Sequence, residues 1–113
     1  MRPIKIFLGD LGYFNNNNKG GLYVPVNIGY LASYTKKLFG NDVEINLFKD
    51  PNKMLDAVAC SSPDVIGLSF YNWNTQMNHA LTRQVRAKLG SDVVIVWGGP
   101  SVDTDSIERA RLF

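Results

Sequence analysis

Cysteine is nearly absent from this 113-residue sequence, and Cys60 is its single example. One cysteine excludes an internal disulfide and cannot build a cysteine-based metal site within the chain. The apolar spacing around Cys60 places it on the inner side of an expected helix. We therefore interpret it as a small buried side chain rather than a nucleophile.

Long hydrophobic runs are also absent, since none approaches the roughly 18 residues of a membrane-spanning helix, and no signal-peptide pattern opens the chain. We expect a cytoplasmic protein without a membrane partner. The formal net charge is only +2, and the basic residues are spread along the expected helices. This distribution argues against a nucleic-acid partner.

Motifs of free-standing catalysis are missing as well. The sequence has no Gly-x-Gly-x-x-Gly, no lysine-bearing phosphate loop, no paired carboxylates in a candidate cleft and no metal-ligand spacing. Its one histidine, His79, falls inside an expected helix away from the strand ends, and we interpret it as a surface residue. No catalytic or metal-binding residue is assigned, and the chain is not expected to catalyse a reaction by itself.

The sequence does contain a regular alternation of strand and helix patterns. Four short segments have the apolar composition of strands in a parallel sheet, over residues 4–8, 43–48, 65–69 and 93–97. The second alternates apolar and polar residues, which predicts an edge strand, whereas the third and fourth are almost continuously apolar, which predicts central strands. Helical stripes cover residues 28–38, 51–61 and 75–89, and a fourth begins at 103–105.

This order predicts one α/β domain over residues 1–113, a three-layer, doubly wound parallel sheet of the flavodoxin-like (Rossmann-type) kind. The edge-like second strand favours the strand order 2-1-3-4. A fifth strand normally completes such a sheet, and it is missing because the sequence stops within the fourth expected helix. We therefore expect a fragment of a longer protein, whose unpaired sheet edge favours dimerisation in isolation.

Ligands of open α/β sheets bind beyond the carboxyl ends of the strands, where the strand order reverses. That point lies between the first and third strands, and three loops reach it. The first loop begins with Asp10, Leu11 and Gly12, passes through four asparagines that we interpret as a solvated tip, and ends at Asn27. Asp10 is either a ligand-loop residue or a partner of the local backbone. Asn27 either caps the next helix or contacts a ligand.

The second loop gathers three aromatic and two amide side chains directly after the third strand. Such a cluster forms either a wall for a flat, partly apolar ligand or a cover over the core or a partner domain. The third loop has two glycines, which permit positive φ and leave no side chain between the backbone and a ligand. The residues of these loops are Ser69, Phe70, Tyr71, Asn72, Trp73 and Asn74, then Gly98, Gly99 and Pro100.

Three segments, in this order and spacing, resemble the cobalamin-binding domain at the N-terminus of cobalamin-dependent radical S-adenosylmethionine enzymes. The wider family carries Asp-x-His-x-x-Gly after the first strand, with a histidine that ligates cobalt. Here the matching stretch is Asp10-Leu11-Gly12-Tyr13-Phe14, without that histidine. The resemblance therefore implies cobalamin bound base-off and without a histidine ligand. The three segments are Pro25-Val26-Asn27-Ile28-Gly29-Tyr30-Leu31-Ala32-Ser33-Tyr34, Asp64-Val65-Ile66-Gly67-Leu68-Ser69 and Trp97-Gly98-Gly99-Pro100, within a likeness that runs from Ile4 to Ser101.

The resemblance also implies roles for the site residues. The dimethylbenzimidazole tail of cobalamin would enter a slot between sheet and helices, flanked by Ser69, Gly98 and Gly99. A larger residue at Gly99 is then expected to fill the slot without disturbing the fold. The lower side of the corrin would face Phe70, Tyr71, Trp73 and Asn74, and the expected site also includes Asp10, Leu11, Gly12, Asn27 and Pro100.

Enzymes of this kind have a separate C-terminal barrel, in which Cys-x-x-x-Cys-x-x-Cys holds a 4Fe-4S cluster that cleaves S-adenosylmethionine. This sequence has no such motif. The resemblance implies that the parent protein performs methyl transfer or radical rearrangement while this chain presents the corrinoid. Two other functions stay open on the same fold. One is a receiver-like interaction domain, although Ser69 stands where a receiver needs aspartate; the other is a nucleotide- or flavin-binding domain.

Overall fold

The computed structural model describes residues 2–12, 26–100, 108 and 111. The expected asparagine tip at 15–18 lies outside this part of the chain, as does the expected fourth helix apart from Glu108 and Arg111. The strand predictions are confirmed to within one residue. In chain order the elements are β1 (Ile4–Gly9), α1 (Val26–Phe39), a 3-10 turn (Gly40–Asp42), β2 (Val43–Phe48), α2 (Pro51–Ser61), β3 (Val65–Ser69), α3 (Thr75–Leu89) and β4 (Val94–Gly98).

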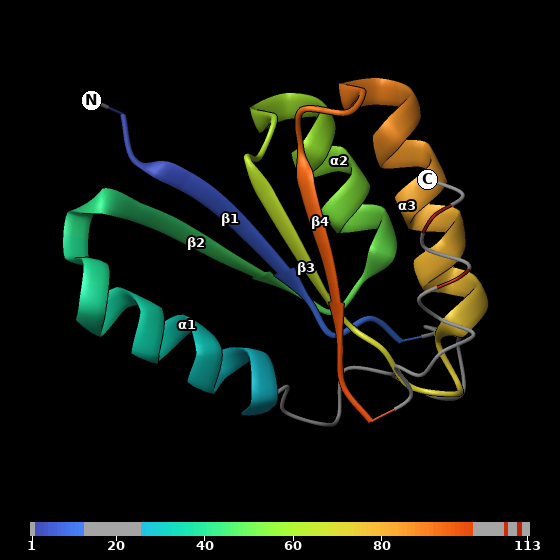
Figure 1. The fold of residues 1–113 in the computed structure, drawn as a ribbon, viewed down its shortest axis with the longest axis horizontal. Coiled ribbons are helices and arrows are strands. Elements are labelled where there is room, and N and C mark those ends of the chain that lie inside the picture. The colour runs from blue at the N-terminus through green and yellow to red at the C-terminus, as the bar shows by residue number, and fades with distance from the viewer. Residues whose placement is uncertain (1, 13–25, 101–107, 109–110, 112–113) are drawn as a thin grey trace.

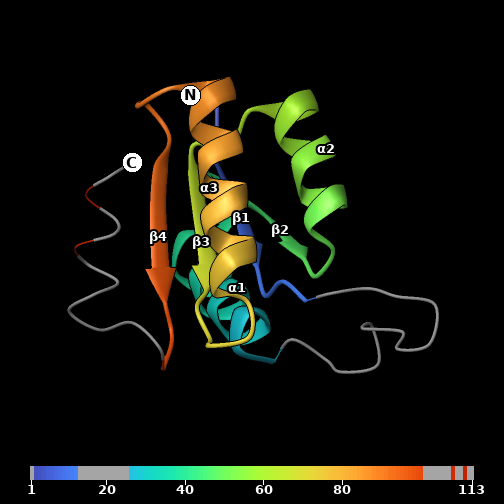
Figure 2. The same ribbon diagram turned by 90° about the vertical axis from the view of Figure 1, so that its right-hand side faces the viewer.

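The four strands form one parallel sheet in the order β2-β1-β3-β4, as predicted. Helix α1 lies on one face of the sheet, beside β2, and α2 and α3 lie side by side on the other (Figures 1 and 2). The doubly wound, three-layer arrangement is therefore confirmed for the described residues. Crossovers on both faces bring the carboxyl ends of β1, β3 and β4 to one edge.

The closed hydrophobic core lies between the sheet and the pair α2 and α3. Alternate side chains of the inner strands point into it, such as Phe7, Ile66 and Leu68. The opposite face, toward α1, is less covered, and Val94 and Val96 are about half exposed there. The core is completed by Leu11, Met54, Val58, Leu81, Val85 and Val93.

Two expectations about burial are wrong. Strand β4 pairs only with β3 in the described sheet, so it lies at an edge rather than in the centre. Its apolar side chains point to two different faces of the sheet. Ile95 and Trp97 pack against the core, and their neighbours Val94, Val96 and Gly98 are exposed on the other face. Cys60 is exposed. It follows the buried Val58 by two positions in α2, which turns it to the far side of the helix.

The amino ends of the strands are tied together by Asp64. Its backbone N–H donates to Lys5 O (2.9 Å), and its carbonyl accepts from Val94 N (3.0 Å). The carboxylate accepts from Lys5 N at 2.8 Å and from both Arg2 guanidinium nitrogens at 2.7 and 2.8 Å. The Arg2 hydrogen bond and the Lys5 amide lower the pKa of Asp64 from 3.8 to about 2.

We predict that Asp64→Asn lowers the urea midpoint of unfolding at neutral pH. A carboxylate whose pKa is lowered by folding contributes stability above its unfolded pKa, near 3.8, and loses it as the pH falls toward about 2. The gap between wild type and variant should therefore shrink across that interval. Asp56→Asn, on the exposed surface of α2, is the control. A gap that stays constant with pH would contradict the assignment.

Candidate functional site

A pocket of about 720 Å³ lies between α1 and the sheet, at the edge where the sequence placed the ligand. Its volume falls in the range of about 300–1,000 Å³ that is usual for small-molecule sites. Helix α1 forms one wall and strands β1, β3 and β4 form the other. The lining residues are Leu8, Asn27, Ile28, Tyr30, Leu31, Tyr34, Val65, Gly67, Leu68, Ser69, Val96, Gly98 and Gly99.

Two glycines, which have no side chain, leave space in this pocket. Strand alternation places Gly67 on the face toward α1, together with Val65 and Ser69, and places Gly98 there with Val96. A Cβ built on Gly98 would meet no atom of the described residues within 4 Å, so that part of the chain leaves its side-chain direction open. A Cβ on Gly67 would come within 2.8 Å of Leu8 Cδ2. The floor of the pocket is therefore shaped by two positions without side chains.

Gly99 has a different role from the one expected. Its φ is +128°, and a Cβ there would lie 2.9 Å from Phe70 O and 3.2 Å from Phe70 N. The same two loops are joined by a hydrogen bond from Phe70 N to Gly98 O at 2.6 Å. A larger residue at Gly99 would push the loops apart, so the expectation that it would fill the slot without disturbing the fold is wrong. Gly98 is the position that meets both conditions.

A small polar network stands at the mouth of the pocket. Asn27 Nδ2 donates to Ser69 Oγ at 2.8 Å and to the Tyr71 hydroxyl at 3.0 Å. Asn27 Oδ1 accepts from Ile28 N at 2.8 Å, so the side chain bonds the first turn of α1 and also lines the pocket. Ser69 uses its side chain toward Asn27 and its carbonyl toward α3.

The aromatic residues of the second loop divide into a stacked pair, half-buried Tyr71 and exposed Trp73, and a buried ring. Tyr71 and Trp73 stack with centroids 4.2 Å apart and planes 6° from parallel, and Trp73 is 58% exposed. Phe70 is buried and stacks on Trp97 at 5.0 Å. His79 packs edge-on against Trp97 at 4.9 Å. It is half-buried in this cluster, which corrects its interpretation as a surface residue.

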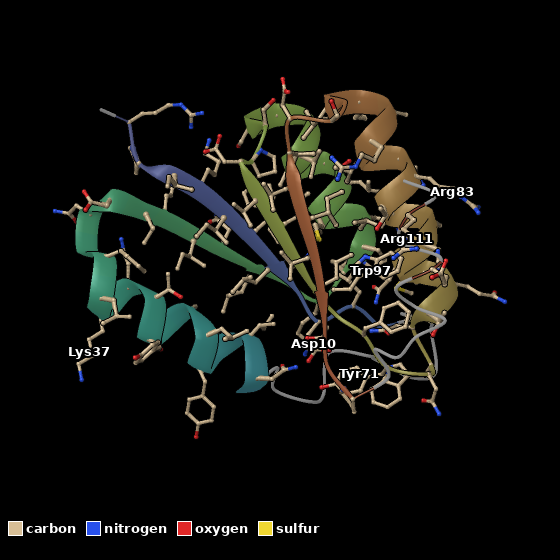
Figure 3. All side chains as sticks on the ribbon, viewed as in Figure 1. Asp10, Lys37, Tyr71, Arg83, Trp97 and Arg111 are labelled. Atoms are coloured by element: carbon tan, nitrogen blue, oxygen red, sulfur yellow. The ribbon has the colours of Figure 1, made fainter. Side chains whose placement is uncertain are left out.

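The structure supports the covering interpretation for Phe70, and the ligand-wall interpretation stays a prediction for Tyr71 and Trp73. Phe70 covers the core, while Tyr71 and Trp73 follow the carboxyl end of β3, and Figure 3 shows Tyr71 and Asp10 at the same end of the sheet. Trp97 points from β4 toward α3 in the same view, and its Nε1 donates to Thr82 Oγ1 at 3.3 Å.

Asn74 joins the first loop to the second. Its side chain is completely buried, and Nδ2 donates to Leu11 O at 3.2 Å and to Ser69 O at 3.0 Å. Oδ1 accepts from Tyr71 N at 2.9 Å. Asn74 and Leu11, both expected to contact a ligand, instead have no exposed surface. In this structure they fix the loops that carry the exposed residues.

The remaining predicted residues lie around the same edge. Asp10 is 5% exposed, and burial raises its pKa while the charge of Lys49 opposes the rise. Gly12 is buried, and its N–H donates to Lys49 O at 3.1 Å, whereas Pro100 is exposed. Among the described residues, no three His, Cys, Asp or Glu side chains gather as metal ligands. No helix in that part of the chain has the length and apolar character to cross a membrane.

Sequence reasoning missed part of the pocket wall. Gly67 carried a usable signal, since a glycine inside an apolar strand marks a close approach or an opening. Tyr30 and Tyr34 are four residues apart and share one helix face, which a helical projection reveals. The buried Asn78 and Thr82 of α3 gave no such signal, because polar residues on a helix are usually exposed.

The chain is similar to known proteins in sequence and in fold. The sequence model of the family described as B12 binding domain matches residues 14–111. A solved structure with a similar fold is a novel cobalamin-binding protein from Desulfitobacterium hafniense DCB-2, determined at 1.5 Å, with a TM-score of 0.59 and 18% identity. The match covers 97% of this chain and 50% of the other, so this chain spans half the length of that relative. No curated protein matches the sequence.

We predict that Asn74→Ala lowers the free energy of unfolding by about 2–4 kcal/mol, because it leaves buried backbone groups of both loops without partners. Chemical denaturation measures the change. Asn72→Ala is the matched control, since Asn72 lies in the same loop and is exposed. Equal stability of the two variants would show that the amide does not hold the loops.

Proposed function

Because this chain belongs to the B12-binding domain family, we propose that it holds a corrinoid and presents it to a separate catalytic domain. The observation that carries the proposal is the apolar pocket between α1 and the carboxyl ends of β1, β3 and β4. A flat, bulky nucleotide base needs a slot without obstructing side chains, and the described residues leave the side-chain direction of Gly98 open.

The described residues fit cobalamin in two parts. The pocket would hold the lower base, with Asn27 and Ser69 at its mouth. The stacked pair of Tyr71 and Trp73 offers a flat, partly exposed surface at the same edge, suited to contact with a macrocycle. When bound, cobalamin would supply a cobalt centre able to carry and release a methyl or alkyl group. The chain's own residues bind and orient it.

We further propose that the lower base leaves the cobalt and that no histidine replaces it. His79 is the one histidine of the sequence. It is packed between α3 and the rings of Phe70 and Trp97, on the face of the sheet opposite the pocket. The buried start of the first loop, Asp10-Leu11-Gly12, carries no nitrogen ligand in its side chains.

The partner in this proposal is a radical S-adenosylmethionine barrel with a 4Fe-4S cluster, in a cytoplasmic parent enzyme that transfers methyl groups or rearranges carbon skeletons. Its support is the resemblance of the three sequence segments. A sequence with one cysteine cannot itself provide the three-cysteine motif of the cluster, so that motif would belong to another domain.

We predict that Gly98→Leu weakens binding of hydroxocobalamin at least about tenfold, a loss of roughly 1.4 kcal/mol, because the new side chain fills the slot. The visible absorption of protein-bound corrinoid after gel filtration, followed by titration, measures the change. Val94→Leu is the control, since Val94 shares that face of β4 but does not line the pocket. Folded wild-type chain that retains no corrinoid would refute the proposed function.

The axial ligation is tested separately. In the cobalt(II) state, electron paramagnetic resonance of the complex should show no splitting from a coordinated nitrogen, and His79→Gln should leave the spectrum unchanged. Nitrogen splitting lost in His79→Gln would identify a histidine ligand. Splitting that survives the substitution would show that the lower base stays on the metal.

A further inference from the structure

Among the described residues, the strand wall of the pocket carries almost no side-chain hydrogen-bonding group away from its mouth. Beyond Asn27 and Ser69, the side chains that the strands contribute are hydrocarbon or absent. Tyr30 and Tyr34 of α1 also line the pocket, and their side chains are mostly exposed, at 73% and 64%. The strand residues concerned are Leu8, Val65, Gly67, Leu68, Val96 and Gly98.

The backbone of the inner strands adds few free groups. The N–H and C=O groups of β1 and β3 are paired with strands on both sides. At the mouth, the Asn27 side-chain amide is already hydrogen-bonded: its Nδ2 donates to Ser69 Oγ and the Tyr71 hydroxyl, and its Oδ1 accepts from Ile28 N. The Ser69 hydroxyl accepts from Asn27 and keeps one proton to donate. Among the described side chains at the mouth, Ser69 can therefore satisfy one acceptor nitrogen of a base.

We propose that this slot selects corrinoids with a benzimidazole-type lower base over those with a purine base. The inference rests on the proposed function. Adenine carries an exocyclic amine and additional ring nitrogens, which would enter a wall of Leu8, Val65 and Val96 and lose their hydrogen bonds to water. Dimethylbenzimidazole presents methyl groups and ring carbons to the same wall, and their burial is favourable.

The test compares three ligands on the 113-residue chain: cobalamin, its adenine-containing analogue pseudocobalamin, and cobinamide, which lacks the nucleotide. Titration followed by visible absorption gives the dissociation constants. We expect cobalamin to bind at least about tenfold more tightly than pseudocobalamin, and also more tightly than cobinamide. No binding of any of the three by folded chain would refute the proposed function. Equal or tighter binding of pseudocobalamin, with cobalamin bound, would refute the selectivity alone. Cobinamide bound as tightly as cobalamin would overturn the proposal at its premise, because the slot would then not hold the lower base.

A polar group placed in the wall should change the preference. Val96→Asn puts an amide into the pocket, and we expect it to reduce the ratio of pseudocobalamin to cobalamin dissociation constants several-fold. Val94→Asn, on the same face of β4 but outside the pocket, should leave the ratio unchanged. A general loss of stability lowers both affinities together. The ratio of the two dissociation constants therefore reports only the effect of the pocket wall. An unchanged ratio in Val96→Asn would overturn the proposal.

Discussion

The buried amide of Asn74 is the interaction on which the carboxyl edge of this sheet depends. It bonds the backbone of the first loop at Leu11 and the backbone of the second loop at Ser69 and Tyr71. The hydrogen bond from Phe70 N to Gly98 O then fixes the start of the third loop against the second. With these segments fixed, Tyr71, Trp73 and the pocket floor have defined positions, so this surface is preformed.

One face of the sheet forms the packed core, and the other lines the pocket. The face toward α2 and α3 is closed, and its large side chains supply the packing. The face toward α1 combines glycine, serine and valine at the carboxyl ends, so the helix and the strands leave space between them. An open face of this kind needs a rigid closed face behind it, because a sheet without a packed core would not keep its strands in register.

The sequence was informative wherever periodicity exists. Strand boundaries, strand order and the location of the pocket followed from alternation and from the topology of parallel sheets. It was least informative within the second loop, because a loop has no repeat that separates inward from outward side chains. Phe70 and Asn74 were therefore grouped with Tyr71 and Trp73, although only the latter pair is accessible. Neighbouring glycines were also indistinguishable, since only coordinates show that Gly99 faces the Phe70 backbone and Gly98 faces open space.

The Asp64 cluster holds the strands at the end opposite the pocket. Ser69 lies five positions after Asp64, which is roughly 16 Å along the strand at about 3.3 Å per residue. Substitutions so far apart, with no shared partners, usually have additive effects on the free energy of unfolding. A substitution that changes ligand preference at the pocket end and lowers stability can therefore be offset by a stabilising substitution at the Asp64 end. Such domains can diverge in sequence without a change of fold.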